Sequence, residues 1–185
     1  MIKQIIAIGI TWFLIFSASA QIYITRSGRV TFFSKTPIEN IDARNNEVTS
    51  ILDTRKGEFV YIVLIKGFKF KKALMEEHFN ENYMESNLFP KAIFKGSIGD
   101  LNNINFSKDG IYPLIVKGNL TLHGVTKNIE VPGSISIAQG RINVNSNFNI
   151  NLKDYKIKVP AIVANNIAEF INITVDCKYV PFKKG

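Results

Sequence analysis

Hydrophobic and polar residues alternate most clearly in the second half of the chain. Between Arg141 and Leu152 the even positions are mostly apolar, as at Ile142, Val144 and Phe148, whereas the odd positions from 143 to 151 all carry asparagine. A period of two over twelve residues predicts a half-buried antiparallel strand with one dry face. Because asparagine has a poor strand propensity, burial of the other face is expected to hold this strand in place.

The same alternation recurs in neighbouring segments. Residues 112–122 and 125–137 alternate on either side of the turn-like dipeptide His123-Gly124, and residues 167–179 alternate near the end of the chain. The four long strands are therefore mostly joined by hairpins. The first half is less regular, and the total is eight or nine strands. Its strand candidates are Val30 with Phe32, and residues 48–54, 59–65 and 91–98.

One segment has helical spacing instead. Leu74, Met75 and Phe79 recur at intervals typical of a helix, which predicts one amphipathic helix over residues 71–84. The strand over residues 59–65 is apolar on both faces, so something is expected to cover its outer side. The helix is the best candidate for this cover.

These elements predict an all-β fold with one short amphipathic helix. Long antiparallel strands with one dry face form either a sandwich or a closed barrel. An antiparallel barrel of about eight strands has an interior that is filled by side chains or holds one small apolar ligand. Residues 21–185 are rich in phenylalanine, which suits both a packed interior and a cavity.

The first twenty residues form a separate unit. Lys3 precedes a twelve-residue, mostly apolar run, and Ala18-Ser19-Ala20 matches a small-x-small cleavage pattern. We interpret residues 1–20 as a signal peptide and residues 21–185 as one domain. The run is shorter than the ~20 residues that span a bilayer. Because Gln21, and not cysteine, would follow the cut, we expect a periplasmic or secreted protein without a lipid anchor.

Composition narrows the function classes. The chain has 46% hydrophobic residues, a net charge of +8 and a single cysteine, which excludes a disordered basic tail and a disulfide scaffold. Cys177 shares the alternate positions of the apolar residues in the last predicted strand and is therefore expected to be buried. The basic, aromatic stretch over residues 66–72 resembles a single-strand nucleic-acid platform, but export and strand-like parity argue against nucleic acid. An anionic membrane surface is a better partner for the positive charge, although the charge also serves solubility.

Catalytic motifs are missing from the sequence. His78, His123 and Cys177 have no zinc-ligand spacing, and no phosphate loop, nucleophile elbow or zinc-protease motif occurs. We therefore expect neither an enzyme nor a metal or other cofactor, apart from a bound lipid. An enzyme acting on a lipid would need an inward carboxylate or histidine. Glu169 is the only candidate that the sequence offers, because it shares the odd-numbered positions of the apolar residues in the last predicted strand.

Two motifs resemble a known family. Residues 120–127 read LTLHGVTK and are followed by the strand 128–132, which is similar to the signature of the YceI-like, polyisoprenoid-binding family. Residues 77–83 and 89–94 are similar to that family's short helix, turn and following strand. The N-terminal third retains only an outline of the usual opening strand, as in a divergent branch.

The resemblance implies a lipocalin-like antiparallel barrel with an elongated apolar channel. The implied ligand is a long-chain isoprenoid, such as a quinone or polyprenol, or a similar apolar lipid, held for carriage, storage or stress protection. Burial of two or three isoprene units supplies roughly 8 to 12 kcal/mol before ordering costs. The candidates for the channel wall are Phe68, Phe70, Met75, Phe79, Phe94, Leu120, Leu122 and Phe148.

Each wall candidate has the alternative of filling a packed core. His123 and Lys127 flank Gly124 and are candidates for contact with a polar headgroup at the cavity mouth, although a lysine there also reaches water easily. The alternative function is a solidly packed, non-catalytic barrel that docks a membrane or a partner. The sequence leaves the oligomeric state open, with a homodimer as one alternative.

Overall fold

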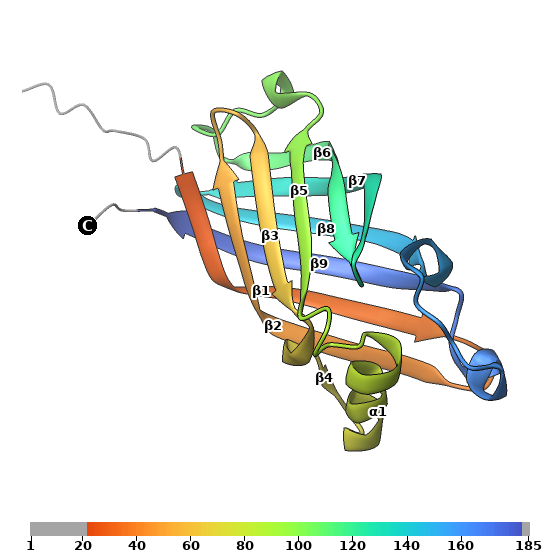
Figure 1. The fold of residues 1–185 in the computed structure, drawn as a ribbon. Coiled ribbons are helices and arrows are strands. Elements are labelled where there is room, and N and C mark those ends of the chain that lie inside the picture. The colour runs from red at the N-terminus through yellow and green to blue at the C-terminus, as the bar shows by residue number, and fades with distance from the viewer. Residues whose placement is uncertain (1–21, 183–185) are drawn as a thin grey trace, which may run out of the picture.

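The computed structural model describes residues 22–182, so the signal peptide expected over residues 1–20 lies outside the described residues. The fold is an antiparallel β-barrel with short helical segments (Figure 1). The strands are β1 (Ile22–Lys35), β2 (Asn40–Asp53), β3 (Glu58–Leu64), β4 (Lys69–Phe70), β5 (Lys91–Ile98), β6 (Gly110–Leu122), β7 (Val125–Ala138), β8 (Arg141–Asn151) and β9 (Phe170–Pro181). The helical segments are η1 (Ile65–Gly67), α1 (Ala73–His78), η2 (Phe79–Tyr83), η3 (Leu101–Asn103), η4 (Leu152–Tyr155) and η5 (Ala161–Asn166).

Eight strands close the barrel. They follow the order β1-β9-β8-β7-β6-β5-β3-β2, and β1 pairs with β2 to complete the ring. The short β4 adds to β2 outside this ring. Closure resolves the choice between a sandwich and a barrel, because every strand of the ring is paired on both edges. Within residues 22–182, no helix has the length and hydrophobicity needed to cross a bilayer.

The alternation in the sequence matches the two faces of the barrel. Ile142 and Val144 of β8 are buried, and the intervening asparagines continue along the outer face. Asn147 Nδ2 donates to Asn172 Oδ1 of β9 at 2.9 Å, and Asn172 Nδ2 donates to Asn149 Oδ1 at 3.0 Å. These cross-strand hydrogen bonds, together with burial of the opposite face, offset the poor strand propensity of asparagine.

The hairpin turns also follow the sequence. His123-Gly124 joins β6 to β7 and Gln139-Gly140 joins β7 to β8, and all four residues have a positive φ between 49° and 73°. Two successive residues with positive φ form the tight turn that matches the twist of paired strands. These turns fix the register of β6, β7 and β8.

The first two strands are longer than the sequence indicates. β1 and β2 each span 14 residues, whereas the pattern predicted only short segments near residues 30–32 and 48–54. The register of β1 against β2 shifts on both sides of Gly28. A β-bulge inserts an extra residue and so breaks the period of two, which hides a strand from a parity analysis.

One end of the barrel is solidly packed. Leu52, Ile135, Ile142 and Tyr179 are each at most 2% exposed and belong to one hydrophobic cluster. The loop around η3 adds apolar side chains from residues 101–106 to the same cluster, so it caps this end. Here the interior is filled by side chains, and no space is left for a ligand.

The predicted helix lies elsewhere than expected. Residues 73–83 are helical, as α1 and then η2, but this segment packs against β4 at the end of the barrel (Figure 1). It does not form the cover expected over the outer face of β3, where Leu64 is 44% exposed. The helix fails to cover that face because its own apolar residues Met75 and Phe79 point into the barrel.

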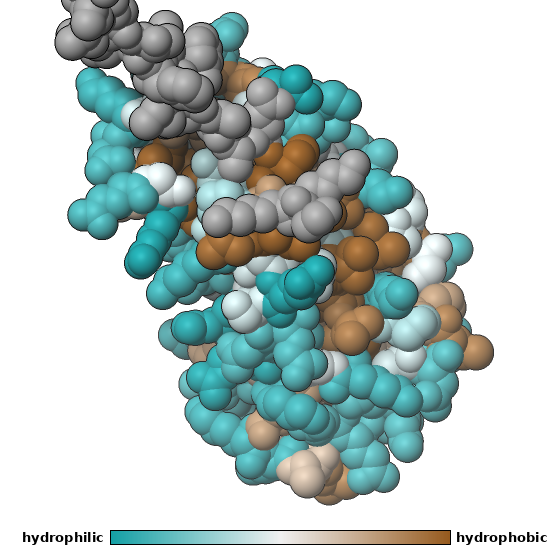
Figure 2. Space-filling view, turned by 90° about the vertical axis from the view of Figure 1, so that its left-hand side faces the viewer, coloured by the Kyte–Doolittle hydropathy of each residue, from teal (hydrophilic) through white to brown (hydrophobic). Residues whose placement is uncertain are grey.

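The outer face of β1, β2 and β3 therefore carries an apolar patch. Ile24, Ile51 and Val60 are neighbours across the three strands, and Ile51 is 42% exposed. Figure 2 shows hydrophobic side chains gathered on this side of the molecule, above a largely hydrophilic region. Contiguous exposed apolar side chains are typical of a contact surface.

Candidate ligand-binding cavity

The half of the barrel away from η3 contains a cavity of about 360 Å³. This volume falls in the range of roughly 300–1,000 Å³ that small-molecule pockets occupy. Inward residues of most strands line it, and side chains of α1, η2 and the segment after β8 complete the wall. All eight apolar residues that the sequence nominated lie in this wall: Phe68, Phe70, Met75, Phe79, Phe94, Leu120, Leu122 and Phe148. Their contact with a ligand stays a prediction.

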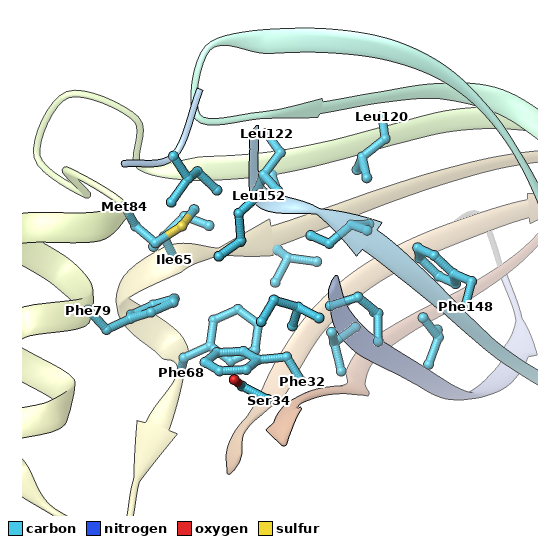
Figure 3. A pocket seen from close by; sticks show the side chains of 18 of the residues that line it. Phe32, Ser34, Ile65, Phe68, Phe79, Met84, Leu120, Leu122, Phe148 and Leu152 are labelled. Atoms are coloured by element: carbon cyan, nitrogen blue, oxygen red, sulfur yellow. The ribbon is translucent and has the colours of Figure 1, made fainter. Parts of the chain in front are cut away.

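A cluster of four phenylalanines forms the wall beside α1. The Phe79 ring lies 5.4 Å from Phe32, 5.6 Å from Phe68 and 5.0 Å from Phe70, measured between ring centroids. Figure 3 shows Phe32, Phe68 and Phe79 grouped together, with Phe148 at the opposite side of the cavity. Because edge-to-face and offset ring contacts add to apolar burial, the cluster fixes the helix to the barrel.

The part of the wall formed by β5 and β6 is built differently. Gly96 of β5 and Gly118 of β6 are cross-strand partners on the inner face, and the Phe94 ring lies over both. A Cβ atom at Gly96 would lie 2.6 Å from Phe94 Cζ, and one at Gly118 would lie 2.8 Å from it. Glycine is therefore required at both positions for the Phe94 ring to lie against the sheet. This also explains why the predicted strands lack an apolar side chain at these inward positions.

The entrance lies between the helical segment and the segment after β8. His78, Tyr83 and Val163 line both the cavity and a shallow outer pocket between η2 and η5. Glu39, in the turn between β1 and β2, connects the two sides of this entrance. It pairs with Lys72 at 3.5 Å and accepts a hydrogen bond from Asn166 Nδ2 at 3.4 Å.

The two polar candidates from the sequence lie outside the cavity wall. His123 contacts Tyr155 O through Nδ1 at 3.1 Å and Glu85 Oε2 through Nε2 at 2.9 Å, and its ring packs edge-on against Phe89. These contacts join three loops, so His123 stabilises the end of the barrel. Lys127 pairs with Leu120 and shares its sheet face, but it is exposed and does not border the cavity.

Glu169 does not fulfil the requirement for an inward carboxylate. It is exposed in the loop before β9, where Lys153 Nζ approaches its Oε1 to 3.0 Å and Asn151 donates a second hydrogen bond. The hydrogen bond from Lys153 lowers the pKa of Glu169. The expected parity fails because β9 begins only at Phe170, so the strand alternation does not extend to Glu169.

Cys177 is also placed unfavourably for chemistry. Cys177 is fully buried, as predicted, and its burial raises the pKa of the thiol to about 12. A thiol with so high a pKa is a poor nucleophile at neutral pH. In the described part of the chain, no three His, Cys, Asp or Glu side chains come together as a group that could hold a metal ion.

Several residues that line the cavity were not nominated from the sequence, because the alternation of side chains describes only one strand at a time. Phe32, Tyr61 and Ile150 share the inward parity of their strands and line the cavity. Their parity could have indicated an inward position, but not which end of the barrel each one faces. Tyr61 is the polar exception among them, and burial raises the pKa of its phenol well above the usual value.

The fold and the cavity together define a class: closed antiparallel barrels that are packed at one end and hollow and apolar at the other. A family model described as YceI-like domain matches residues 17–179. The chain therefore belongs to the YceI-like family, as the sequence motifs indicated. Among curated proteins, the search found no significant match.

Solved structures share this fold at low sequence identity. A polyisoprenoid binding domain from Saccharophagus degradans, described as implicated in plant cell wall breakdown, has a TM-score of 0.77 at 15% identity, over 88% of this chain and 99% of that one. BcnA from Burkholderia cenocepacia has a TM-score of 0.69 at 14% identity, over 83% of this chain and 96% of that one. The YceI protein of Campylobacter jejuni has a TM-score of 0.64 at 16% identity, over 81% of this chain and 90% of that one.

Proposed function

We propose that this protein is an exported carrier or store that holds a long-chain isoprenoid, or a similar apolar lipid, in the barrel cavity. The observation that carries the proposal is the composition of the cavity wall. Hydrophobic side chains dominate the wall, and no lysine or arginine borders it in the described part of the chain. Within residues 22–182, Glu39 is the only acidic residue in the wall, and it lies at the entrance.

The energetics support a ligand that consists mainly of hydrocarbon. Each buried CH₂ contributes about 0.8 kcal/mol, so two or three isoprene units contribute roughly 8 to 12 kcal/mol before ordering costs. Micromolar affinity requires about 8 kcal/mol. Phenylalanine and methionine suit such a ligand because their contacts are large and non-directional. The polyisoprenoid binding described for the Saccharophagus degradans domain supports the same class of ligand here.

We also propose that the role is not catalytic and involves no metal or other cofactor. The exposed position of Glu169 and the raised pKa of buried Cys177 support this view, because neither presents a reactive group to the cavity. His78 and Glu39 do line the cavity, but they lie at its entrance, where Glu39 pairs with Lys72. Nucleic acid is not a proposed partner. Lys69, in the basic stretch considered above, pairs with Glu76 at 2.7 Å, while Phe68 and Phe70 point into the cavity.

A lipid must enter and leave the cavity, and the entrance has features that favour binding to an anionic membrane surface. Ile38, Leu74 and Ile162 are 64%, 60% and 93% exposed, and each adjoins a residue that lines the cavity. Lys71 and Lys72 precede Leu74 by three and two residues, and they pair with Asp42 at 3.0 Å and with Glu39 at 3.5 Å through largely exposed side chains. Exposed apolar side chains next to lysines are the combination that attracts a protein to anionic lipid, at about 1 kcal/mol per basic residue.

Native mass spectrometry of the protein purified from its own host tests the main proposal. We expect a reproducible bound mass that organic extraction removes and identifies as a long-chain lipid. The same measurement gives the mass of the mature chain, which should begin at Gln21 if export and cleavage occur as proposed. Ligand-free protein that also ignores added quinones and polyprenols would favour the alternative of a packed interaction module.

Flotation with vesicles tests the membrane proposal separately. We expect binding to vesicles that contain phosphatidylglycerol, weaker binding to pure phosphatidylcholine, and loss of binding with high salt. Leu74→Ser combined with Ile162→Ser should reduce binding, whereas Ile111→Ser, at an exposed position on β6, serves as the control. Equal binding to both kinds of vesicle would contradict the proposal.

A homodimer also has a candidate surface, the apolar patch of Ile24, Ile51 and Val60 on the outer face of the first three strands. We propose that a second copy of the chain covers this patch. Sedimentation velocity should then show a dimer for the original sequence and a monomer for Ile51→Glu. A chain that is monomeric without the substitution would contradict the dimer.

A further inference from the structure

Three hydroxyl groups form a chain between the packed end of the barrel and the cavity. Ser50 Oγ of β2 lies 2.6 Å from the hydroxyl of Tyr179 of β9, and that hydroxyl lies 3.0 Å from the hydroxyl of Tyr61 of β3. Ser50 and Tyr179 are each 1% exposed. Tyr61 is the member of the chain that lines the cavity.

The donor of each hydrogen bond among these three hydroxyl groups can be assigned, one bond after the other. Tyr179 donates its hydrogen bond to Tyr61, which uses its only hydroxyl proton. The bond between Ser50 and Tyr179 must then be donated by Ser50. Tyr61 accepts at the end of the chain and keeps its own proton. Ser50 also lies near Tyr61, but among residues 22–182 Tyr61 donates no hydrogen bond within the usual distance.

The position of the Tyr61 hydroxyl is fixed by its surroundings. The ring stacks on Phe59 at a centroid distance of 5.8 Å and contacts Phe94 at 6.3 Å. Burial raises the pKa of both Tyr61 and Tyr179, so both phenols stay protonated at neutral pH. A neutral O–H group that borders an apolar cavity and donates no close hydrogen bond costs free energy until a ligand accepts from it.

We propose that Tyr61 donates a hydrogen bond to an uncharged acceptor on the bound lipid, such as the carbonyl oxygen of a quinone ring or a ketone, and that Ser50 and Tyr179 position it. This inference rests on the proposed lipid-binding function. It also fixes the orientation of the ligand, with the carbonyl end toward the packed end and the hydrocarbon chain toward α1. An anionic headgroup such as a phosphate does not suit this subsite, because no lysine or arginine borders the cavity in the described residues.

The test compares two probes of similar length, the isoprenoid ketone farnesylacetone and its oxygen-free parent hydrocarbon. Tyr61→Phe should weaken ketone binding about two- to tenfold, the equivalent of one neutral hydrogen bond, and leave hydrocarbon binding unchanged or slightly stronger. Tyr112→Phe removes an exposed hydroxyl that donates to Lys108 O and serves as the matched control. Tyr179→Phe should give a smaller loss than Tyr61→Phe, because the donor remains but is less well positioned.

Infrared spectroscopy of the bound ketone provides an independent readout. The C=O stretch should shift to lower frequency in the original protein and return toward its value in hydrocarbon solvent in Tyr61→Phe. If both probes bind and Tyr61→Phe affects them equally, or the C=O stretch does not move, this inference is overturned while lipid binding stands. If neither probe binds the original protein, lipid binding and this inference fail together.

Discussion

Phe148→Asp tests whether the cavity is the binding site. Phe148 is half-buried on β8 and forms the side of the cavity opposite the phenylalanine cluster (Figure 3). An aspartate there places a carboxyl group in an apolar wall where, among the described residues, no lysine or arginine borders it. Such a group is tolerated only if it is protonated or if water enters the cavity, and both outcomes weaken the binding of hydrocarbon.

The structure gives the expected magnitudes. Displacing the water around a polar group without a compensating hydrogen bond costs at least about 2 kcal/mol, which weakens lipid binding about 30-fold or more. The stability of the ligand-free protein should fall less severely. Full burial of a phenylalanine contributes about 1.5–3 kcal/mol, and Phe148 is buried only in part, so we expect a loss below about 3 kcal/mol.

Two further variants on the same strand provide the controls. Ile142 is 2% exposed and belongs to the packed end, so Ile142→Asp combines a cavity cost of about 2–5 kcal/mol with a buried, unpaired carboxyl group. That sum approaches the total stability of a typical domain, about 5–15 kcal/mol, and should prevent folding. Asn149→Asp lies on the exposed outer face and should change neither folding nor binding.

Thermal unfolding followed by circular dichroism, and titration with a fluorescent isoprenoid, distinguish the outcomes. We expect Phe148→Asp to fold and to lose binding, Ile142→Asp not to fold, and Asn149→Asp to resemble the original protein. If Phe148→Asp unfolds as Ile142→Asp does, the interior is a packed core and the cavity reasoning is wrong. If it folds and binds with unchanged affinity, the lipid occupies another site.

Three other predictions follow from local geometry. Gly118→Ala forces its Cβ against the backbone of β5 at Lys95 and Gly96, and against the Phe94 ring, and should cost about 1–3 kcal/mol or more, measured by denaturant unfolding. Gly140→Ala meets no atom within 4 Å and should cost only the strain of its positive φ, so equal losses would contradict the close contact. Cys177 should resist thiol reagents in the native state, because burial raises its pKa to about 12, and should react only as fast as the protein unfolds; rapid labelling would show that β9 opens. The hydrogen bond from Lys69 lowers the pKa of Glu76, so this group stabilises the fold above its ordinary pKa and loses that effect as the pH falls through its lowered pKa. Glu76→Gln should therefore be less stable than the original by less than about 1 kcal/mol at neutral pH and equally stable in strong acid, and a difference that persists in acid would refute the pairing.

The hairpin-linked half of the barrel was predictable from local sequence. Alternation identified β6, β7 and β8, and the dipeptide at residues 123–124 identified the turn between the first two of them. Side-chain parity and positive-φ turns are properties of a few adjacent residues, so no tertiary information is needed to recognise them. Of the eight apolar side chains nominated for the wall, Phe94, Leu120, Leu122 and Phe148 lie on strands of the ring, whereas Phe68, Phe70, Met75 and Phe79 line the cavity from residues 68–79 outside the ring.

Local reasoning failed where a contact between distant segments decides the structure. The bulges of β1 depend on its partners β2 and β9, and the position of α1 depends on a phenylalanine cluster drawn from three separate segments. Glu169 was placed on the inner face because the alternation was extended past the start of β9. In each case the missing information was which segment lies opposite.

The sequence by itself determined which side chains face inward and, through its motifs, the family. Only the tertiary structure decided which of those side chains fill space and which border it. Ile142 and Phe148 share one face of β8, yet the first is packed and the second lines a cavity. The reason is physical: parity reports the direction of a side chain relative to its own strand, whereas packing depends on what the opposite wall and the two ends of the barrel place against it.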